Sequence, residues 1–151
     1  MHPWKKAAYV AVFFLAAYTG HMKLAGCVLR NEKGEILLLH RNKKGRVQWE
    51  LPGGKLEENE EEKAAALREI KEELGVDVRI VSYLGCASFT EDGTECVYSW
   101  HEAEAARKGA APAICEPQTF DDLRYWNLVD LKTRDDLSAN LRNLLASGIL
   151  E

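Results

Sequence analysis

Three glutamates lie near the end of a short stretch, GKLEENEEEKAAALREIKEELGV, at positions 54–76. Glu69 and Glu73 are four residues apart and Glu72 follows Glu69 by three, so in a helix their side chains are neighbours. Like charges at this spacing destabilise a helix, and no lysine or arginine stands four residues after Glu69 or Glu72. Clustered carboxylates are the hard oxygen ligands that Mg²⁺ takes while it bridges to substrate phosphates. The spacing therefore indicates a divalent metal site, with a solvated acidic helix face as the alternative.

These carboxylates require a helix that begins near residue 60 and ends near residue 74, with Gly75 as its C-terminal cap. Its apolar positions share one face at about 100° per residue: Ala64, Ala66, Leu67, Ile70 and Leu74. This face is expected to pack on a sheet, which leaves the three glutamates on the opposite side. The Pro-Gly-Gly loop at positions 52–54 precedes the helix and is expected to bring backbone carbonyls close to the carboxylates.

Apolar runs on both sides of this helix predict strands bounded by turn residues. They cover residues 23–30, 36–41, 48–51, 76–89, 94–105 and 124–131, with a turn at residues 91–93. A second helix is expected over residues 133–148, with Thr133 and Asp136 as a capping box and Gly148 as its stop. Its apolar stripe consists of Leu137, Leu141, Leu144 and Leu145. Because strands and helices interleave, the expected fold class is α/β, a sandwich around a mixed sheet.

Composition narrows the class of protein. A chain of 151 residues with 46% hydrophobic and 29% charged residues fits one globular domain with a sizeable core. The net charge of -4 argues against a general nucleic-acid binder, which would present a basic face. No two cysteines form a CxxC pair, which fits neither a zinc site nor a secreted disulfide framework. Reduced thiols in a cytoplasmic protein are therefore expected.

The first 21 residues differ from the rest, because two lysines precede a continuous apolar run at positions 7–17. This run is shorter than the roughly 20 apolar residues that span a bilayer, so no membrane association is expected. We interpret residues 1–21 as an N-terminal extension ahead of a domain at residues 22–151. It is a leader that resembles a signal-peptide core, a remnant upstream of Met22, or an accessory element packed on the domain, and packing is preferred.

The whole stretch at 54–76 resembles the Nudix hydrolase signature, G-x5-E-x7-R-E-U-x-E-E-x-G-U, in which U is a bulky aliphatic residue. The constrained positions are filled by Gly54, Glu60, Arg68, Glu69, Ile70, Glu72, Glu73, Gly75 and Val76. The preceding WELPGG and the order of strands extend the resemblance over most of residues 22–145. The resemblance implies that family's α/β/α sandwich around a mixed sheet. It also implies its reaction, the hydrolysis of a nucleoside diphosphate linked to a group X with Mg²⁺ or Mn²⁺.

The resemblance also implies roles for individual residues. The metal ligands are expected to be Glu69, Glu72, Glu73 and the backbone carbonyl of Gly53 or Gly54. Arg68 is expected to hold the glutamate side chains in place, and Glu60 to brace the loop and helix. Glu116 is a candidate for a carboxylate from a later loop that assists catalysis.

Substrate choice is expected to depend on another segment. EPQTFDDLRYWNL, residues 116–128, resembles a segment of the MutT-type nucleoside triphosphate branch, in which acidic and aromatic residues help to hold the base. Base binding needs a stacking face and hydrogen-bonding groups at the base edge. The candidates are Asp121, Asp122, Trp126, Asn127 and Phe89. The alternative for the acidic pair is that it only caps a turn.

The expected enzyme hydrolyses a nucleoside triphosphate, oxidised or not, to a monophosphate and pyrophosphate, as a monomer or homodimer. An ADP-ribose or other nucleoside diphosphate sugar pyrophosphatase is the main alternative. A nucleotide-sensing module that does not hydrolyse its ligand is an alternative of another class. An enzyme acting on RNA ends would require a basic groove, and no stable nucleic-acid partner is expected.

Overall fold

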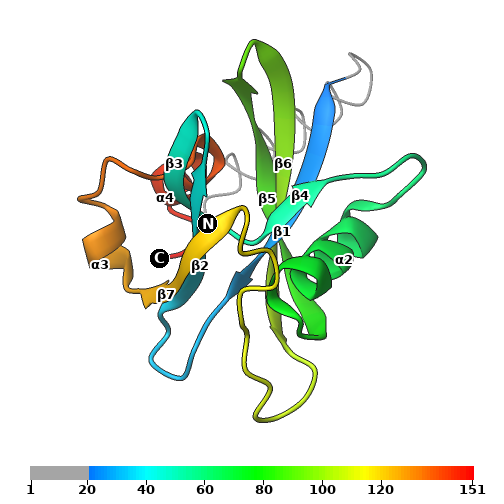
Figure 1. Ribbon diagram of the computed structural model, residues 1–151, viewed down its shortest axis with the longest axis vertical. Coiled ribbons are helices and arrows are strands. Elements are labelled where there is room, and N and C mark those ends of the chain that lie inside the picture. Colours follow the sequence, from blue (N-terminus) through cyan, green and yellow to red (C-terminus); the bar gives the residue numbers. More distant parts are fainter. Residues whose placement is uncertain (1–20) are drawn as a thin grey trace.

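The computed structural model describes residues 21–151, so the expected N-terminal extension lies outside the described residues except for His21. The strands form two hydrogen-bonded sheets (Figure 1). The larger sheet has the order β4-β1-β6-β5 and contains β1 (Met22–Leu29), β4 (Gly53–Lys55), β5 (Val78–Glu91) and β6 (Thr94–Ala105). The smaller sheet has the order β3-β2-β7 and contains β2 (Ile36–Lys43), β3 (Arg46–Glu50) and β7 (Phe120–Trp126). In the larger sheet β1 and β6 run parallel and the other neighbours antiparallel, so this sheet is mixed, as predicted.

Helices cover both sides of the strands. They are α2 (Glu62–Leu74), α3 (Leu128–Leu131) and α4 (Ala139–Ser147). Figure 1 shows α2 on one side of the strands and α3 and α4 on the other. This arrangement confirms the predicted α/β/α sandwich. Within residues 21–151, no helix has both the length and the hydropathy needed to cross a membrane.

Strand β2 separates two apolar cores. Leu37 and Leu39 point into the core that contains the buried face of α2, whereas Ile36 and Leu38 point into the core that contains α4. All four side chains have no exposed surface. Each such side chain stabilises the fold by about 1.5–3 kcal/mol through apolar burial. A continuous apolar run is therefore required here, because both faces of the strand are covered.

The turn between β5 and β6 confirms the predicted hairpin at residues 91–93. Asp92 and Gly93 have φ angles of 51° and 75°. Two successive residues in the left-handed region make a turn whose twist matches that of paired strands, and Asp-Gly is a favoured sequence for it.

The buried face of α2 differs from the prediction. Leu67 is 37% exposed and Ala64 is exposed, so neither belongs to the packed face. The buried residues are Ala65, Ala66, Ile70, Glu73 and Leu74. By helical geometry Glu73 lies only about 20° from Ala66 around the axis. The prediction that all three glutamates lie opposite the packed face is therefore wrong, and Glu73 is inside it.

Two predictions in the C-terminal quarter also need correction. Residues 128–131 are not strand but α3, because the Asn127 side chain accepts a hydrogen bond from the Asp130 amide and starts a helical turn. The capping box at Thr133 is absent, since Ser138 caps α4 and accepts from the Leu141 amide. The predicted stop is confirmed, with Gly148 in the left-handed region at φ 72°.

Candidate functional site

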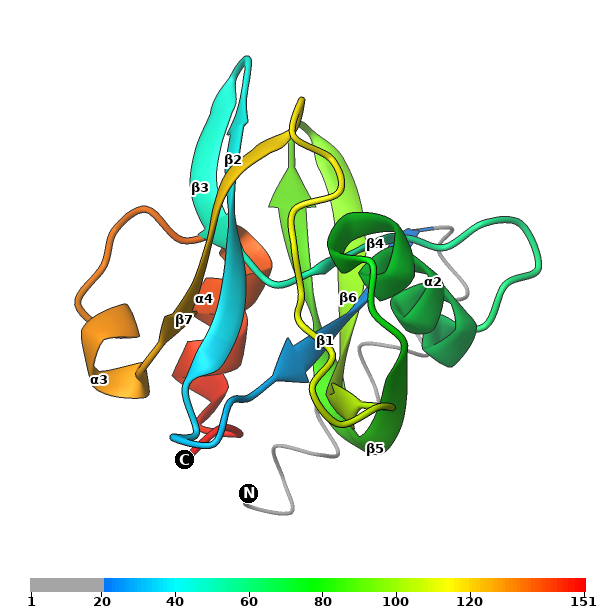
Figure 2. The same ribbon diagram turned by 60° about the horizontal axis from the view of Figure 1, so that its bottom comes forward.

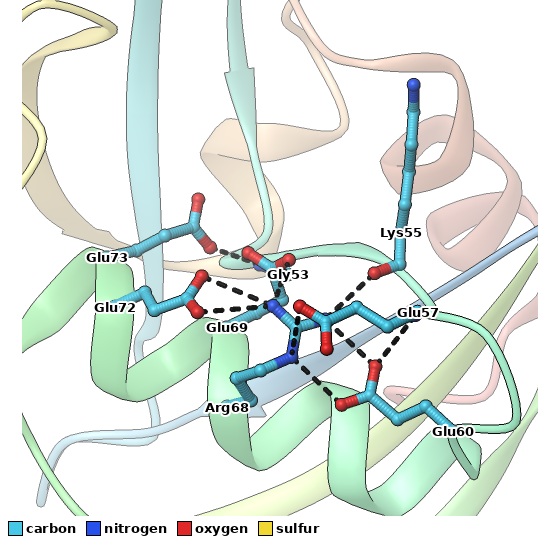
Figure 3. A network of polar contacts seen from close by, with 8 residues as sticks. All are labelled: Gly53, Lys55, Glu57, Glu60, Arg68, Glu69, Glu72 and Glu73. Carbon is cyan, nitrogen blue, oxygen red and sulfur yellow. Dashed lines mark hydrogen bonds and ion pairs between the residues drawn. The ribbon is translucent and has the colours of Figure 1, made fainter.

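Arg68 is the centre of a polar network between α2 and the loop that precedes it (Figure 3). Its Nε and Nη2 donate to the two carboxylate oxygens of Glu60, each at 2.9 Å, and Nη2 also donates to the Lys55 carbonyl at 3.0 Å. The guanidinium lowers the pKa of Glu60 to about 2. Arg68 therefore ties α2 to the loop and strand that precede it.

The remaining nitrogen of Arg68 faces the metal-ligand candidates. Nη1 lies 3.0 Å from Oε1 of Glu69 and 3.2 Å from Oε2 of Glu72. Burial raises the pKa of Glu69, and Arg68 opposes that change. One side chain thus holds two carboxylates of the cluster, as the resemblance implies.

Glu73 is the most deeply buried of the three glutamates. It is 3% exposed, and its Oε1 accepts a hydrogen bond of 2.7 Å from the Gly53 amide. Burial raises its pKa well above the usual range, and the negative charge of Glu69 adds to the effect. The bond joins the end of α2 to the first residue of β4 (Figure 3).

The carboxylate of Glu69 lies against Gly54 and occupies the space that a side chain at position 54 would need. A Cβ atom at position 54 would lie 2.5 Å from the carboxylate carbon of Glu69, which is shorter than any normal contact. The missing side chain lets the carboxylate lie directly against the backbone of β4. The Pro-Gly-Gly loop thus lies close to this carboxylate, and the participation of its backbone carbonyl in a metal site stays a prediction.

Two further carboxylates border the cluster. Glu116, predicted from the sequence, is close enough that its charge raises the pKa of both Glu69 and Glu73. Glu50 was not predicted, although it is only 8% exposed and its charge also raises the pKa of Glu73. Arg41 donates to both oxygens of Glu50, at 2.8 and 3.0 Å. An acidic residue directly before an apolar strand end and a Pro-Gly-Gly loop was the signal that could have identified Glu50.

The chemistry of this donor set fits a divalent cation. Carboxylates are the ligands that Mg²⁺ prefers, and the raised pKa values of Glu69 and Glu73 show that nearby positive charge does not compensate their burial. In the observed side-chain positions, no group of three acidic, histidine or cysteine side chains within residues 21–151 converges on one ion. Glu69 and Glu72 bind Arg68 instead, so a metal ion can be held only if these carboxylates turn toward it.

The polar residues predicted to bind the base are engaged with partners outside the glutamate cluster. Asp121 contacts His40 Nδ1 at 2.6 Å, and the hydrogen bond lowers the pKa of Asp121. Asp122 pairs with Arg124 at 2.8 Å, and the Asn127 side chain caps α3.

The two aromatic candidates are packed beside the second core. Trp126 packs edge-on against Trp49, with ring centroids 5.1 Å apart, and Arg134 lies 4.7 Å over its ring. Phe89 is partly buried against the core that contains α4. The role of these residues in substrate binding stays a prediction.

The chain matches a family model over most of its length and individual relatives over a shorter part. The sequence model described as the NUDIX domain matches residues 20–147. An 8-oxo-dGTP diphosphatase of Proteus vulgaris is 39% identical over 59 residues, which cover 38% of this chain and 53% of that protein. An RNA pyrophosphohydrolase of Marinomonas sp. (strain MWYL1) is 35% identical over 66 residues, which cover 44% of this chain and 40% of that protein. The chain thus spans about half or less of the length of these relatives.

A similar fold is found in a solved structure. The crystal structure of a MutT NUDIX hydrolase from Burkholderia pseudomallei is 27% identical, with a TM-score of 0.73. The match covers 83% of this chain and 96% of that protein.

Proposed function

This chain belongs to the NUDIX domain family, and from that premise we propose that it is a metal-dependent pyrophosphohydrolase acting on a nucleoside diphosphate linked to a further group. The observation that carries the proposal is the set of carboxylates gathered where the Pro-Gly-Gly loop meets α2: Glu50, Glu69, Glu72, Glu73 and Glu116. A diphosphate is itself strongly anionic, so it approaches this set only when cations lie between them.

Each residue of the cluster has a proposed role. Glu69, Glu72 and Glu73 would hold Mg²⁺ or Mn²⁺ together with the backbone carbonyl of Gly53 or Gly54. When bound, the ion would lower the pKa of water and stabilise negative charge on the leaving group. Arg68 and Glu60 position the ligands, because they lock the loop to the helix.

Glu116 is the proposed acceptor for the proton of the attacking water. It is half-buried, it follows Cys115, whose amide bonds to the Glu73 carbonyl, and its charge acts on both Glu69 and Glu73, so it lies beside the proposed metal ligands. The water oxygen forms a bond to one phosphorus, the bond from that phosphorus to the bridging oxygen breaks, and the leaving phosphate takes the electron pair.

The proposed substrate is a nucleoside triphosphate, with oxidised purines included, and the products are a monophosphate and pyrophosphate. The 8-oxo-dGTP diphosphatase of P. vulgaris supports this choice by its name and similarity. The acidic and aromatic segment at residues 116–128 supports it further. An aspartate that accepts hydrogen bonds from the donor edge of a purine would discriminate between bases.

A substrate panel tests the proposal. Triphosphates with normal and oxidised bases, ADP-ribose, a nucleoside diphosphate sugar and a dinucleoside polyphosphate are compared at equal concentration with Mg²⁺, and all products are identified. We expect the highest kcat/KM for a triphosphate, with pyrophosphate released. A kcat/KM for ADP-ribose tenfold above every triphosphate would overturn the substrate choice. Tight nucleotide binding with no turnover would overturn the proposed hydrolysis.

A further inference from the structure

A pocket of about 390 Å³ lies at the C-terminal end of α2, where the segment after β6 turns back toward the helix. Its polar and turn residues are Lys71, Gly75, Asp77, Arg107, Lys108 and Gly109, and we call it the basic pocket. None of the clustered glutamates lines it. It is therefore a separate concavity from the carboxylate site.

The charge of the basic pocket is unbalanced. Lys71, Arg107 and Lys108 supply three positive charges, and Asp77 supplies one negative charge. Lys71 and Asp77 lie 3.3 Å apart, but both side chains are more than half exposed, so water and salt screen this pair. Within the described part of the chain, Arg107 and Lys108 have no ion-pair partner. The pocket thus carries a net charge of about +2 in a chain whose net charge is -4.

The end of α2 opposes this positive charge only in part. The C-terminal carbonyls of a helix carry partial negative charge when they have no partner. Here the Lys71, Glu73 and Leu74 carbonyls accept hydrogen bonds of 2.9–3.1 Å from the Gly75, Cys115 and Ala113 amides. Three of the last four carbonyls of α2 are therefore already hydrogen-bonded, which weakens the negative end of the helix that faces the basic pocket.

A second pocket with basic residues differs from the basic pocket in the partners of its cations. A pocket of about 540 Å³ beside α4 also contains three cations, Lys132, Arg134 and Arg142. There Lys132 pairs with Glu151, Arg134 pairs with Asp136, and Arg142 donates to a backbone carbonyl. Its cations already have partners, whereas two of the three in the basic pocket have none among residues 21–151.

We propose that the basic pocket is a binding site for a phosphate-bearing anion, either free pyrophosphate or the phosphate tail of a nucleotide. Its volume lies within the range of small-molecule sites, about 300–1,000 Å³. Arginine matches phosphate oxygens in a bidentate manner, and lysine adds a point charge. The site needs no metal ion, unlike the carboxylate cluster, and it exists whether or not the chain hydrolyses nucleotides.

The segment that forms the pocket also reaches the carboxylate cluster. Figure 2 shows the yellow segment after β6 running beside α2 toward β7. Arg107 and Lys108 lie at its start, and Glu116 lies near its end, one residue after the amide that bonds to the Glu73 carbonyl. An anion bound at the start of the segment would hold it against α2.

The test is binding of inorganic pyrophosphate without divalent metal. Excess EDTA keeps the carboxylate cluster free of ions, so that cluster repels the anion. Isothermal titration and melting curves are compared with sodium chloride at equal ionic strength. We expect saturable stabilisation of the wild-type chain by mass action. The double variant Arg107→Gln/Lys108→Gln should bind at least about tenfold more weakly, because it loses both unpaired charges.

Two further variants make the test specific. Asp77→Asn removes the carboxylate of the pocket and frees Lys71, so it should bind pyrophosphate more tightly than the wild type. Lys33→Gln/Lys63→Gln removes two exposed charges elsewhere and should bind as the wild type does. Melting curves without ligand confirm that each variant is folded, and the single variant Lys108→Gln replaces the double variant if that one unfolds.

The outcomes separate the two phosphate sources and the two hypotheses. Tighter binding of a nucleoside triphosphate than of pyrophosphate identifies a nucleotide as the ligand, and equal or weaker binding identifies the free anion. Equal pyrophosphate affinity in the wild type and in Arg107→Gln/Lys108→Gln would overturn the site, as would stabilisation no larger than that by sodium chloride. A chain that lacks hydrolase activity but shows the expected series of affinities would reject the proposed function and retain this site.

Discussion

At the residue scale, Arg68 connects most of the groups that the proposed chemistry needs. Its three nitrogens contact Glu60, Glu69, Glu72 and the Lys55 carbonyl at the same time. A planar guanidinium can do this because its donors point in fixed and divergent directions, whereas the single ammonium of lysine cannot. The geometry of the glutamates therefore depends on one residue that is not proposed to touch the substrate.

Replacing Arg68 by lysine tests this dependence. Arg68→Lys keeps the positive charge but loses the bidentate contact with Glu60. Changes to groups that orient metal ligands typically cost about 10–100-fold in activity or metal affinity, and a loss of that size is expected here. The measurements are kcat and the Mg²⁺ concentration at half-maximal rate. A loss below twofold in both would show that the arginine network does not position the ligands.

Glu73→Gln removes a proposed ligand with little change of shape. The amide oxygen of glutamine can still accept the hydrogen bond from Gly53, so the fold should be kept. We expect kcat to fall by several orders of magnitude, and we expect Mg²⁺ to stop raising the melting temperature. Wild-type protein melted with millimolar Mg²⁺ and Mn²⁺ is the reference. Activity within tenfold of the wild type would contradict the proposed role.

Glu60 gives a pH dependence of stability. Its pKa is lowered in the folded chain from 4.5 to about 2 by Arg68. A group with a depressed folded pKa stabilises the fold above its unfolded pKa, and this stabilisation is lost as pH falls from about 4.5 to 2. Urea melts across this interval should show a shallower decline for Glu60→Gln than for the wild type. Parallel declines in the two proteins would exclude a contribution of Glu60 to acid stability.

At the scale of elements, the site depends on the close pairing of β1 with β4. Gly26 and Gly53 are direct partners in the register, and the side chain of Tyr98 fills the space that their missing Cβ atoms leave. A Cβ at Gly26 would also lie 2.5 Å from the Pro52 carbonyl. The Pro-Gly-Gly loop is therefore held against β1 by backbone contact, and its Gly53 amide is placed where Glu73 can accept from it.

Gly26→Ala should disturb this junction. The added methyl group contacts both the Tyr98 ring and a backbone carbonyl, and overpacking of this kind costs about 1–3 kcal/mol or more. The matched change is Tyr98→Phe, which keeps the ring and removes a hydroxyl that has no hydrogen-bond partner among the described residues. In denaturant unfolding, Gly26→Ala should have a lower free energy of unfolding than the wild type. Tyr98→Phe should have the same free energy of unfolding as the wild type. A larger loss of unfolding free energy in Tyr98→Phe than in Gly26→Ala would mean that the hydroxyl, not the close packing, stabilises the contact between β1 and β4.

At the scale of the whole molecule, all the groups proposed for catalysis lie after Met22, and residues 22–151 supply two apolar cores. Backbone hydrogen bonds join the loop before α2 to β1, and others join the segment that precedes Glu116 to the end of α2. The hydrolytic site is therefore expected to form within residues 22–151.

A chain that begins at Met22 tests this boundary. It should fold and keep the kcat of the full chain, because no proposed ligand or positioning residue is removed. Its melting temperature and its size in solution show whether the first residues act as an accessory element. A shortened chain that folds but lacks activity would show that the catalytic domain extends into residues 1–21.

The sequence by itself determined the helix that carries the site, its glycine cap and the ligand candidates, because these depend on local spacing. This spacing is short, because every one of these residues lies between Gly54 and Val76. The contacts among Glu60, Arg68, Glu69 and Glu72 are local as well. The apolar runs likewise predicted most strands, since burial on one or both faces leaves a readable pattern.

Only the tertiary structure decided which carboxylates meet and how deeply each one is buried. Glu50 lies at the end of β3, outside the stretch at 54–76, and its proximity to Glu73 depends on how the strands pack against α2. The burial of Glu73 depends on the rotation of α2 against the sheet, which small residues such as Ala65 and Ala66 allow and which periodicity alone does not fix. Long-range contacts set these features, because the same local pattern is compatible with several rotations of a helix and several pairings of strands.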